Sequence, residues 1–151
     1  MFALLAFGPY LIQDVAPKAE LKLDKTSAVV GQAVKGKVTI TFGEGLHAYQ
    51  NPPTGEYQIP LKLEAAKGTT LIKAIYPKGE DFLMSGEATP SKVYKDKIEI
   101  PVIVKAPTRP GKQTIKLSVN YQQCNDSACF PPGTVDVTGT LTVSIPPKKK
   151  G

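Results

Sequence analysis

The chain has 151 residues, of which 41% are hydrophobic and 21% are charged, and its formal net charge at pH 7 is +6. This length suits one compact domain that can bury a core without disulfide bonds. The 14 prolines, the 13 glycines and the lack of tryptophan favour a turn-rich β protein. Because the positive charge comes from dispersed lysines and a single arginine, Arg109, the composition argues against nucleic-acid binding.

Both ends of the chain differ from its middle. The first twelve residues, MFALLAFGPYLI, are apolar but too short to span a bilayer, and they lack the basic residue that opens a signal peptide. Residues 1–18 are therefore interpreted as the remnant of a signal peptide, a packing arm or vector-derived residues, and only the first directly implies export. Residues 147–151, PKKKG, are interpreted as a basic tail or linker. Residues 19–146 remain as one domain.

Within that domain, short runs of alternating apolar and polar residues are separated by Gly, Pro, Asn or Asp, and no amphipathic helix lies between them. The predicted strands are 19–24, 37–42, 57–65, 69–77, 97–106, 114–121 and 134–145. This pattern predicts an all-β fold, an immunoglobulin-like β-sandwich of about seven to nine strands. Pro60 and Pro101 lie inside two of the runs and predict edge strands or bulges there.

The alternation also predicts which side chains face the core. In 37–42 and 114–121 the core set is Val38, Ile40, Phe42, Ile115, Leu117, Val119 and Tyr121. The opposite set in the second run is polar, and counting on by twos from Asn120 through Gln122 reaches Cys124. The parity therefore predicts that the sulfur of Cys124 faces outward.

Both cysteines of the chain lie in one stretch, YQQCNDSACFPPG, residues 121–133. A disulfide across so short a loop contributes only about 2 kcal/mol in the chain-entropy model, so the pair is poorly placed to hold the fold together. A four-residue loop, 125–128, would bring Cys124 and Cys129 opposite each other at two strand ends, within disulfide distance. The two sulfurs can bond without rearranging the fold.

Three chemistries are open to such a pair: metal ligation, a structural bridge and reversible thiol–disulfide exchange. With only His47 beside the two cysteines, the chain lacks the four ligands of a closed zinc site, so no metal or other cofactor is predicted. A structural bridge is the plain alternative, but the small loop and the predicted exposure favour exchange. The Cys-x4-Cys spacing has no helix after it to activate a thiol, and Asp126 opposes thiolate formation, so the pair is interpreted as a passive relay.

Three segments carry a resemblance to a known family. They are GLHAYQNPP, VYKDKIEIPV and, most specifically, YQQCNDSACFPPGTV, with its tyrosine, glutamine, paired cysteines, aromatic residue and two prolines. Over residues 19–145 the chain resembles the periplasmic N-terminal domain of the thiol:disulfide interchange protein DsbD, the bacterial membrane disulfide reductase.

The resemblance implies a periplasmic immunoglobulin-like domain that works in a thiol–disulfide relay. Its cysteine pair would receive reducing equivalents from a thioredoxin-like domain of the same protein, which a membrane domain supplies. It would pass them to a periplasmic disulfide isomerase and to a cytochrome c maturation thioredoxin. In this family the second cysteine, here Cys129, forms the mixed disulfides, and the first, here Cys124, resolves them. The alternative is a non-catalytic adhesion or assembly domain with a structural disulfide.

The resemblance further implies a cap over the pair, for which Glu80, Asp81 and Phe82 are the closest match, flanked by Gly79 and Gly86 as sources of backbone freedom. Aromatic residues are expected beside the site, at His47, Tyr49 and Phe130, although a tyrosine is familiar where His47 stands. Plain structural roles also fit: Phe82 as a loop anchor, Glu80 and Asp81 as solvated charge, and His47 as a polar residue at a strand end.

Overall fold

The structure of the protein is a computed structural model that describes residues 15–148. The interpretations of residues 1–14 and of most of the basic tail fall outside that range. The described strands are β1 (Lys18–Leu23), β2 (Ser27–Val29), β3 (Ala33–Thr41), β4 (His47–Tyr49), β5 (Lys62–Ala65), β6 (Thr70–Ala74), β7 (Glu80–Phe82), β8 (Ser91–Lys95), β9 (Lys97–Lys105), β10 (Gly111–Tyr121), β11 (Gln123–Cys124) and β12 (Gly133–Ser144).

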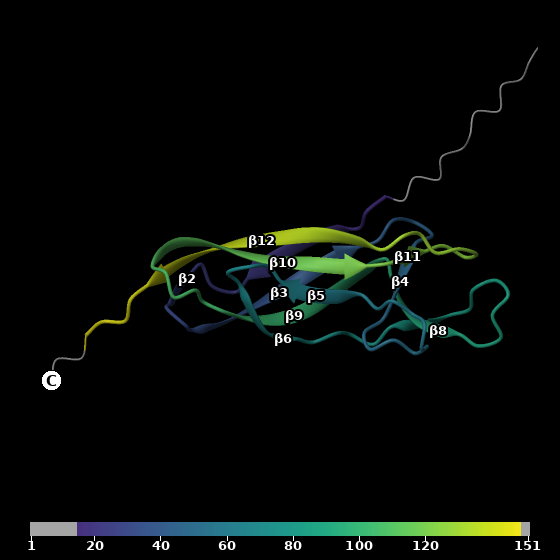
Figure 1. Ribbon diagram of the computed structural model, residues 1–151, viewed down its shortest axis with the longest axis horizontal. Coiled ribbons are helices and arrows are strands. Elements are labelled where there is room, and N and C mark those ends of the chain that lie inside the picture. Colours follow the sequence, from purple (N-terminus) through teal and green to yellow (C-terminus); the bar gives the residue numbers. More distant parts are fainter. Residues whose placement is uncertain (1–14, 149–151) are drawn as a thin grey trace, which may run out of the picture.

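The strands form three four-stranded sheets (Figure 1). The first has the order β1-β3-β9-β6 and the second the order β2-β12-β10-β5, and residues of both meet in one apolar core. The third, β11-β4-β8-β7, lies at one end of this sandwich. All pairings are antiparallel except that of β12 with β2. The predicted all-β, immunoglobulin-like fold is confirmed. The described residues form 12 strands instead of the expected seven to nine, because the third sheet adds strands that show no alternation in the sequence.

The main core is built from the alternating faces that the sequence predicts. The core set predicted in the runs 37–42 and 114–121 is at most 6% exposed throughout. Each such side chain contributes about 1.5–3 kcal/mol of transfer free energy when it leaves water, so these faces decide how the two large sheets pack. Leu63 on β5 and Leu141 on β12, the two strands that flank β10 in the second sheet, belong to the same core.

The predictions of an edge strand at Pro60 and at Pro101 have different outcomes. Pro60 lies just before β5, which is an edge strand of the second sheet, as predicted. Pro101 lies in β9, which pairs with both β3 and β6, so the prediction of an edge strand there is wrong. The ladder with β6 ends at Val102, and beyond it Pro101 only accepts a hydrogen bond, from the backbone N–H of Ile75 at 2.9 Å. Proline fits because no N–H is needed for that contact.

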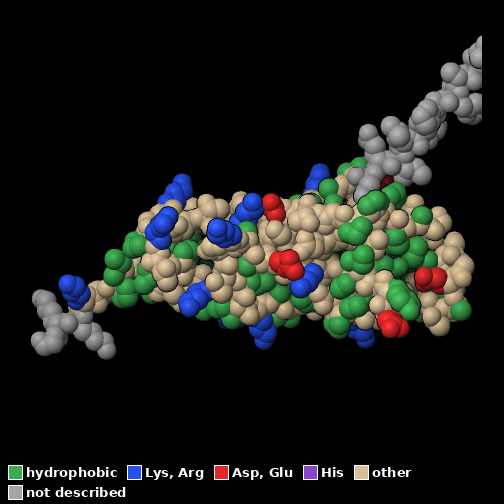
Figure 2. All heavy atoms as spheres, viewed as in Figure 1, with side chains coloured by type: hydrophobic (Ala, Val, Ile, Leu, Met, Phe, Trp, Pro, Cys, Tyr) green, Lys and Arg blue, Asp and Glu red, His purple; other side chains and the backbone are tan. Residues whose placement is uncertain are grey.

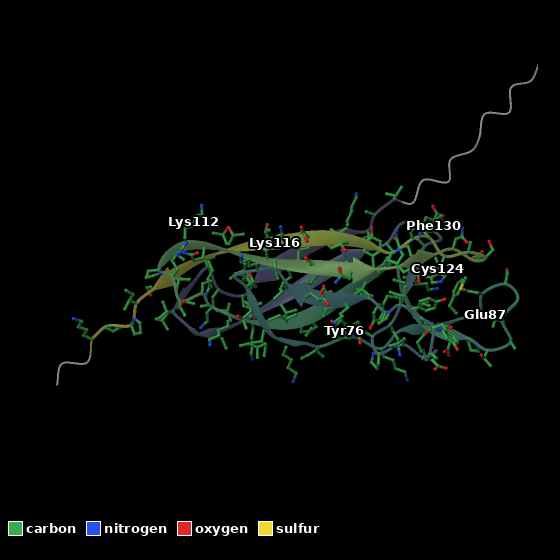
Figure 3. All side chains as sticks on the ribbon, in the orientation of Figure 1. Tyr76, Glu87, Lys112, Lys116, Cys124 and Phe130 are labelled. Atoms are coloured by element: carbon green, nitrogen blue, oxygen red, sulfur yellow. A yellow bond between two sulfur atoms is a disulfide. The ribbon has the colours of Figure 1, made fainter. Side chains whose placement is uncertain are left out.

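The third sheet positions the cysteines. In Figure 3, Cys124 and Phe130 lie at the end of the molecule formed by the third sheet, with Glu87, while Lys112 and Lys116 lie along the body.

Figure 2 shows the Lys and Arg side chains spread singly over the visible face, without a basic cluster. Among residues 15–148, none belongs to a helix long and apolar enough to cross a membrane.

Candidate functional site

The two cysteines form a disulfide whose halves differ in exposure. Cys124 and Cys129 face each other in an antiparallel bridge, as the four-residue loop predicts. Cys124 is 0% exposed, whereas Cys129 is exposed to solvent. The predicted outward orientation of Cys124 is wrong because β10 ends at Tyr121 and the chain then enters the third sheet, where the consecutive residues Gln123 and Cys124 are both buried. Strand parity does not continue across that change of sheet.

The loop between the cysteines is held by its own asparagine. The Asn125 Oδ1 atom accepts hydrogen bonds from the backbone N–H groups of Ser127 at 3.0 Å and Ala128 at 2.8 Å. The backbone N–H of Asn125 donates to the carbonyl of Ala128 at 2.9 Å. After the loop, the N–H of Phe130 donates to the carbonyl of Gln123 at 2.8 Å. These bonds fix Cys129 at the surface, one turn away from its buried partner.

A second apolar cluster, separate from the main core, lies behind the disulfide. Its members are Tyr49 from β4, Val93 from β8, Met84 and Cys124, and Phe82 packs against them. Met84, which follows Phe82 by two residues, is 8% exposed. We call these five residues the disulfide cluster. One sulfur of the pair thus sits in apolar surroundings, and the other meets water.

Phe82, in the segment that the family resemblance suggested as a cap, packs against this cluster. We call residues 80–87 the cap segment. The ring of Phe82 is half-buried and contacts the ring of His47, with centroids 4.2 Å apart and planes tilted by 42°. Three residues further on, the backbone N–H of Ser85 donates to the carbonyl of Asp126 in the cysteine loop, at 2.9 Å. A ring contact and a backbone hydrogen bond therefore join the cap segment to the site.

The two glycines around the cap play different parts. Gly86 has a φ of +87° in a turn closed by the hydrogen bond from the N–H of Glu87 to the carbonyl of Met84, a conformation that favours glycine. Gly79 is needed for close packing, because a Cβ there would lie 2.7 Å from the backbone oxygen of Val93. Gly79 thus anchors the cap segment against β8, and the backbone freedom expected at the two glycines stays a prediction.

The two acidic residues of the cap pair with lysines of β8. Glu80 lies 3.2 Å from the Nζ of Lys95, and Asp81 lies 2.8 Å from the Nζ of Lys92. Both carboxylates are more than 60% exposed, so each pair contributes at most about 1 kcal/mol. This arrangement matches the reading of Glu80 and Asp81 as solvated charge at the edge of the sheet.

His47 begins β4, at a strand end, and its side chain is buried. It is 2% exposed, pairs in register with Cys124, and its Nε2 atom has no hydrogen-bond partner among the described residues. Burial lowers the pKa of His47, the charge of Asp126 opposes that shift, and Lys95 adds to it. A cavity of about 220 Å³ adjoins the ring, lined also by Phe82, Lys95 and Asp126. A neutral imidazole therefore lies between Phe82 and the strand that carries Cys124.

The hydroxyl group of Tyr49 lies near two sulfur atoms. This hydroxyl lies 3.5 Å from the Sδ of Met84, to which it donates, and 3.9 Å from the Sγ of Cys129. Burial and then the charge of Glu87 raise the pKa of Tyr49, so the hydroxyl stays protonated at neutral pH. The site thus holds one hydrogen-bond donor next to its exposed sulfur.

The chemistry that this arrangement offers is sulfur exchange. Among residues 15–148, no group of three or more His, Cys, Asp or Glu side chains is placed to hold a metal ion. The exposed Sγ of Cys129 can be reached by a thiolate from outside, and the buried Sγ of Cys124 can act as the leaving group.

Comparison with protein families decides the relationship. The family model described as thiol:disulfide interchange protein DsbD, N-terminal, matches residues 17–141 of the chain. The chain belongs to this family. The DsbD N-terminal match and the disulfide-bonded cysteine pair together support thiol–disulfide exchange as its chemistry. No curated protein matches the chain in sequence.

Two solved structures are similar to the chain. The N-terminal periplasmic domain of ScsB from Proteus mirabilis superposes with a TM-score of 0.56 at 14% identity, covering 81% of this chain. The chain spans only 44% of that structure's length. The DsbD N-terminal domain of Neisseria meningitidis in its reduced form gives a TM-score of 0.44 at 21% identity, over 76% of this chain and 78% of that one.

The structure gathers most of the predicted site residues at one end of the molecule. Phe82, His47 and Tyr49 surround the disulfide, and Phe130 follows it on the far side of the loop. The sequence reasoning missed Met84 and Val93, which pack in the disulfide cluster. For Met84 the available signal was its place two residues after Phe82, inside the segment assigned as a cap.

Replacing Phe82 by Ala tests the cap. Removal of the ring should speed both the reduction of the disulfide by dithiothreitol and the reoxidation of the reduced pair, because small molecules then reach the sulfurs more easily. Stability should change by about 1 kcal/mol. The neighbouring variant Leu83→Ala is the control, since Leu83 is 58% exposed and outside the disulfide cluster. Unchanged rates in a folded Phe82→Ala domain would assign the shielding to Tyr49 or Phe130.

The buried His47 predicts a loss of stability in mild acid. In the unfolded chain a histidine binds a proton near pH 6.5. Because the pKa of His47 is lowered in the folded state, the folded protein binds this proton only at a lower pH. The unfolded state therefore binds more protons as pH falls below about 6.5, and stability drops by up to about 1.4 kcal/mol per pH unit. Urea unfolding at pH 7.5, 6.5 and 5.5 should show a steeper loss for the wild type than for His47→Phe. Parallel losses in the two proteins would contradict this assignment.

Proposed function

We propose that this domain relays reducing equivalents through a reversible Cys124–Cys129 disulfide, as a protein-disulfide reductase domain. The observation that carries the proposal is the unequal exposure of the two cysteine residues: Cys129 is exposed to solvent and Cys124 is not. An attacking thiolate from a partner protein can reach only one of them. The order in which the two sulfurs react follows from that asymmetry.

In the first half of the cycle the domain is reduced. A thiolate of the donor attacks the Sγ of Cys129, a new S–S bond forms between the proteins, and the bond between Cys129 and Cys124 breaks. Cys124 departs with the electron pair and is then protonated. The donor's second thiolate attacks its own first sulfur, which releases Cys129 as a thiolate and leaves the donor oxidised. Two electrons have then passed to the domain.

In the second half the domain reduces an acceptor. The thiolate of Cys129 attacks a disulfide of the acceptor, and one acceptor sulfur leaves with the electron pair. Cys124, deprotonated, then attacks Cys129 in the mixed disulfide, so the internal disulfide closes again and the acceptor leaves as a dithiol. Cys124 is thus the resolving residue, and its position opposite Cys129 keeps it within reach.

Membership of the family supports thioredoxin-like partners for this domain. The donor would be a thioredoxin-like domain, tethered with this one to a membrane domain in a longer protein. The acceptors would be a periplasmic disulfide isomerase and a cytochrome c maturation thioredoxin. A periplasmic location is supported by the ScsB relative, which is a periplasmic domain. We expect specificity to come from docking around the cap segment and the cysteine loop.

Single-cysteine variants test the proposal through trapped intermediates. Cys124→Ala keeps the exposed sulfur and removes the resolving one, so it should accumulate a mixed disulfide with a thioredoxin-like partner. Cys129→Ala keeps only the buried sulfur and should trap far less. The amounts can be read from non-reducing gels and mass spectrometry after mixing with the oxidised partner.

The double variant Cys124→Ala, Cys129→Ala is the control in this experiment. It should fold, because a six-residue bridged loop contributes only about 2 kcal/mol, and it should form no adduct. Equal trapping by the two single variants would reverse or cancel the assigned roles. No trapping by either, with both folded, would favour the alternative of an adhesion or assembly domain with a structural bridge.

A further inference from the structure

We propose that the Tyr49 hydroxyl is the hydrogen-bond donor that stabilises the Cys129 thiolate, and that the Sδ of Met84 holds this hydroxyl while the disulfide is closed. The proposal rests on the function above, in which Cys129 is released as a thiolate in one half of the cycle and attacks in the other. It makes Tyr49 a catalytic residue, because its hydroxyl touches the reacting sulfur.

The distances describe a donor with two possible acceptors. The hydroxyl has one proton to give, and it lies 3.5 Å from the Sδ of Met84 and 3.9 Å from the Sγ of Cys129. A thioether and a disulfide sulfur are both weak acceptors, so in the oxidised protein the nearer one, the Sδ of Met84, accepts the hydrogen bond. A thiolate carries a full negative charge and accepts a stronger, charge-assisted bond. Opening of the disulfide therefore changes which acceptor is preferred.

The ring of Tyr49 is already held where this bond requires it. Its strand β4 lies between β11 and β8, and Tyr49 pairs with Val93 in register. Its carbonyl accepts the backbone N–H of Leu61 at 3.0 Å, and the residue is 7% exposed. A hydroxyl proton can turn about its C–O bond without any movement of the ring. The change of acceptor therefore costs little reorganisation.

The hydroxyl also stays available as a donor through the cycle. Burial and the charge of Glu87 raise the pKa of Tyr49, so the group keeps its proton when a thiolate forms beside it. When the donor protein resolves the first mixed disulfide, the electron pair goes to Cys129, and the hydroxyl can bond this sulfur as it leaves. The same bond is present when Cys129 begins its attack on the acceptor.

The experiment measures the alkylation of reduced protein by iodoacetamide as a function of pH. The thiolate of Cys129 attacks carbon and expels iodide, and fragment-ion mass spectrometry locates the modification. In Tyr49→Phe we expect the inflection of the rate profile to rise by about one pH unit, because the thiolate has lost its donor. At neutral pH about tenfold fewer thiolates remain, each about threefold more nucleophilic, so the rate falls about threefold. The high-pH plateau should rise about threefold.

Two further variants separate the hydrogen bond from packing. Tyr94→Phe removes another buried hydroxyl of the same sheet, one that bonds the backbone of Asn51 and Pro77, and should leave the profile unchanged. Met84→Leu keeps the apolar volume but removes the competing acceptor, so the inflection should move slightly lower. This variant also serves if Tyr49→Phe does not fold, as judged by its circular dichroism and thermal unfolding.

The outcomes that overturn the proposal are distinct. A Tyr49→Phe profile that superposes on the wild type, or that drops at every pH with its inflection unmoved, shows that the hydroxyl does not stabilise the thiolate. An unchanged or raised inflection in Met84→Leu contradicts the role given to Met84. Since iodoacetamide needs no partner protein, failure here leaves the relay untouched, and failure of the trapping experiment leaves this profile as it is.

Discussion

The site depends on the antiparallel pairing of β11 with β4, which places Cys124 opposite His47. This pairing takes the chain out of the second sheet just after Tyr121 and turns the first cysteine into the protein. The short loop that follows returns the second cysteine to water. One change of sheet therefore creates two sulfurs of unequal access, and an exchange that proceeds in a defined order requires that inequality.

The surroundings of the pair follow from the same small sheet. Its strands bring the disulfide cluster together from segments far apart in the sequence, and its edge strand β7 carries Phe82 onto that cluster. The cap segment is fastened by the pairing of β7 with β8, by the ion pairs of Glu80 and Asp81 with two lysines of β8, and by the burial of Met84 in the cluster. The ring contact with His47 and a backbone hydrogen bond to Asp126 join it to the cysteine loop and its neighbours.

The sequence predicted the sandwich far better than the site sheet. All seven predicted runs overlap strands of the two large sheets, and the long strands β3 and β10 show one buried and one solvated face most clearly. None of the four strands of the third sheet was found from the alternation. β4 has all three residues buried and β11 has only two residues, so neither shows a period of two.

Errors at individual residues have the same origin. The orientation of Cys124 was wrong because parity was carried across a change of sheet, and the burial of His47 depends on contacts made by a cap segment distant in sequence. The cysteine pair was identified from its spacing in the sequence, whereas Phe82 and Tyr49 were assigned to the site through the family resemblance. Met84 was missed because a methionine in a loop carries no periodic signal, and only the fold shows that its sulfur meets the hydroxyl of Tyr49.

The relay requires that the Cys124–Cys129 bond opens and closes in exchange reactions and does not only hold the structure together. The reduction potential of this bond tests that requirement most directly. The protein can be equilibrated with dithiothreitol redox buffers, and its thiols counted by alkylation and mass spectrometry. We expect a potential within the range of thiol–disulfide oxidoreductases, between about −270 and −120 mV. A potential below about −300 mV would mark a structural bridge and would contradict the relay.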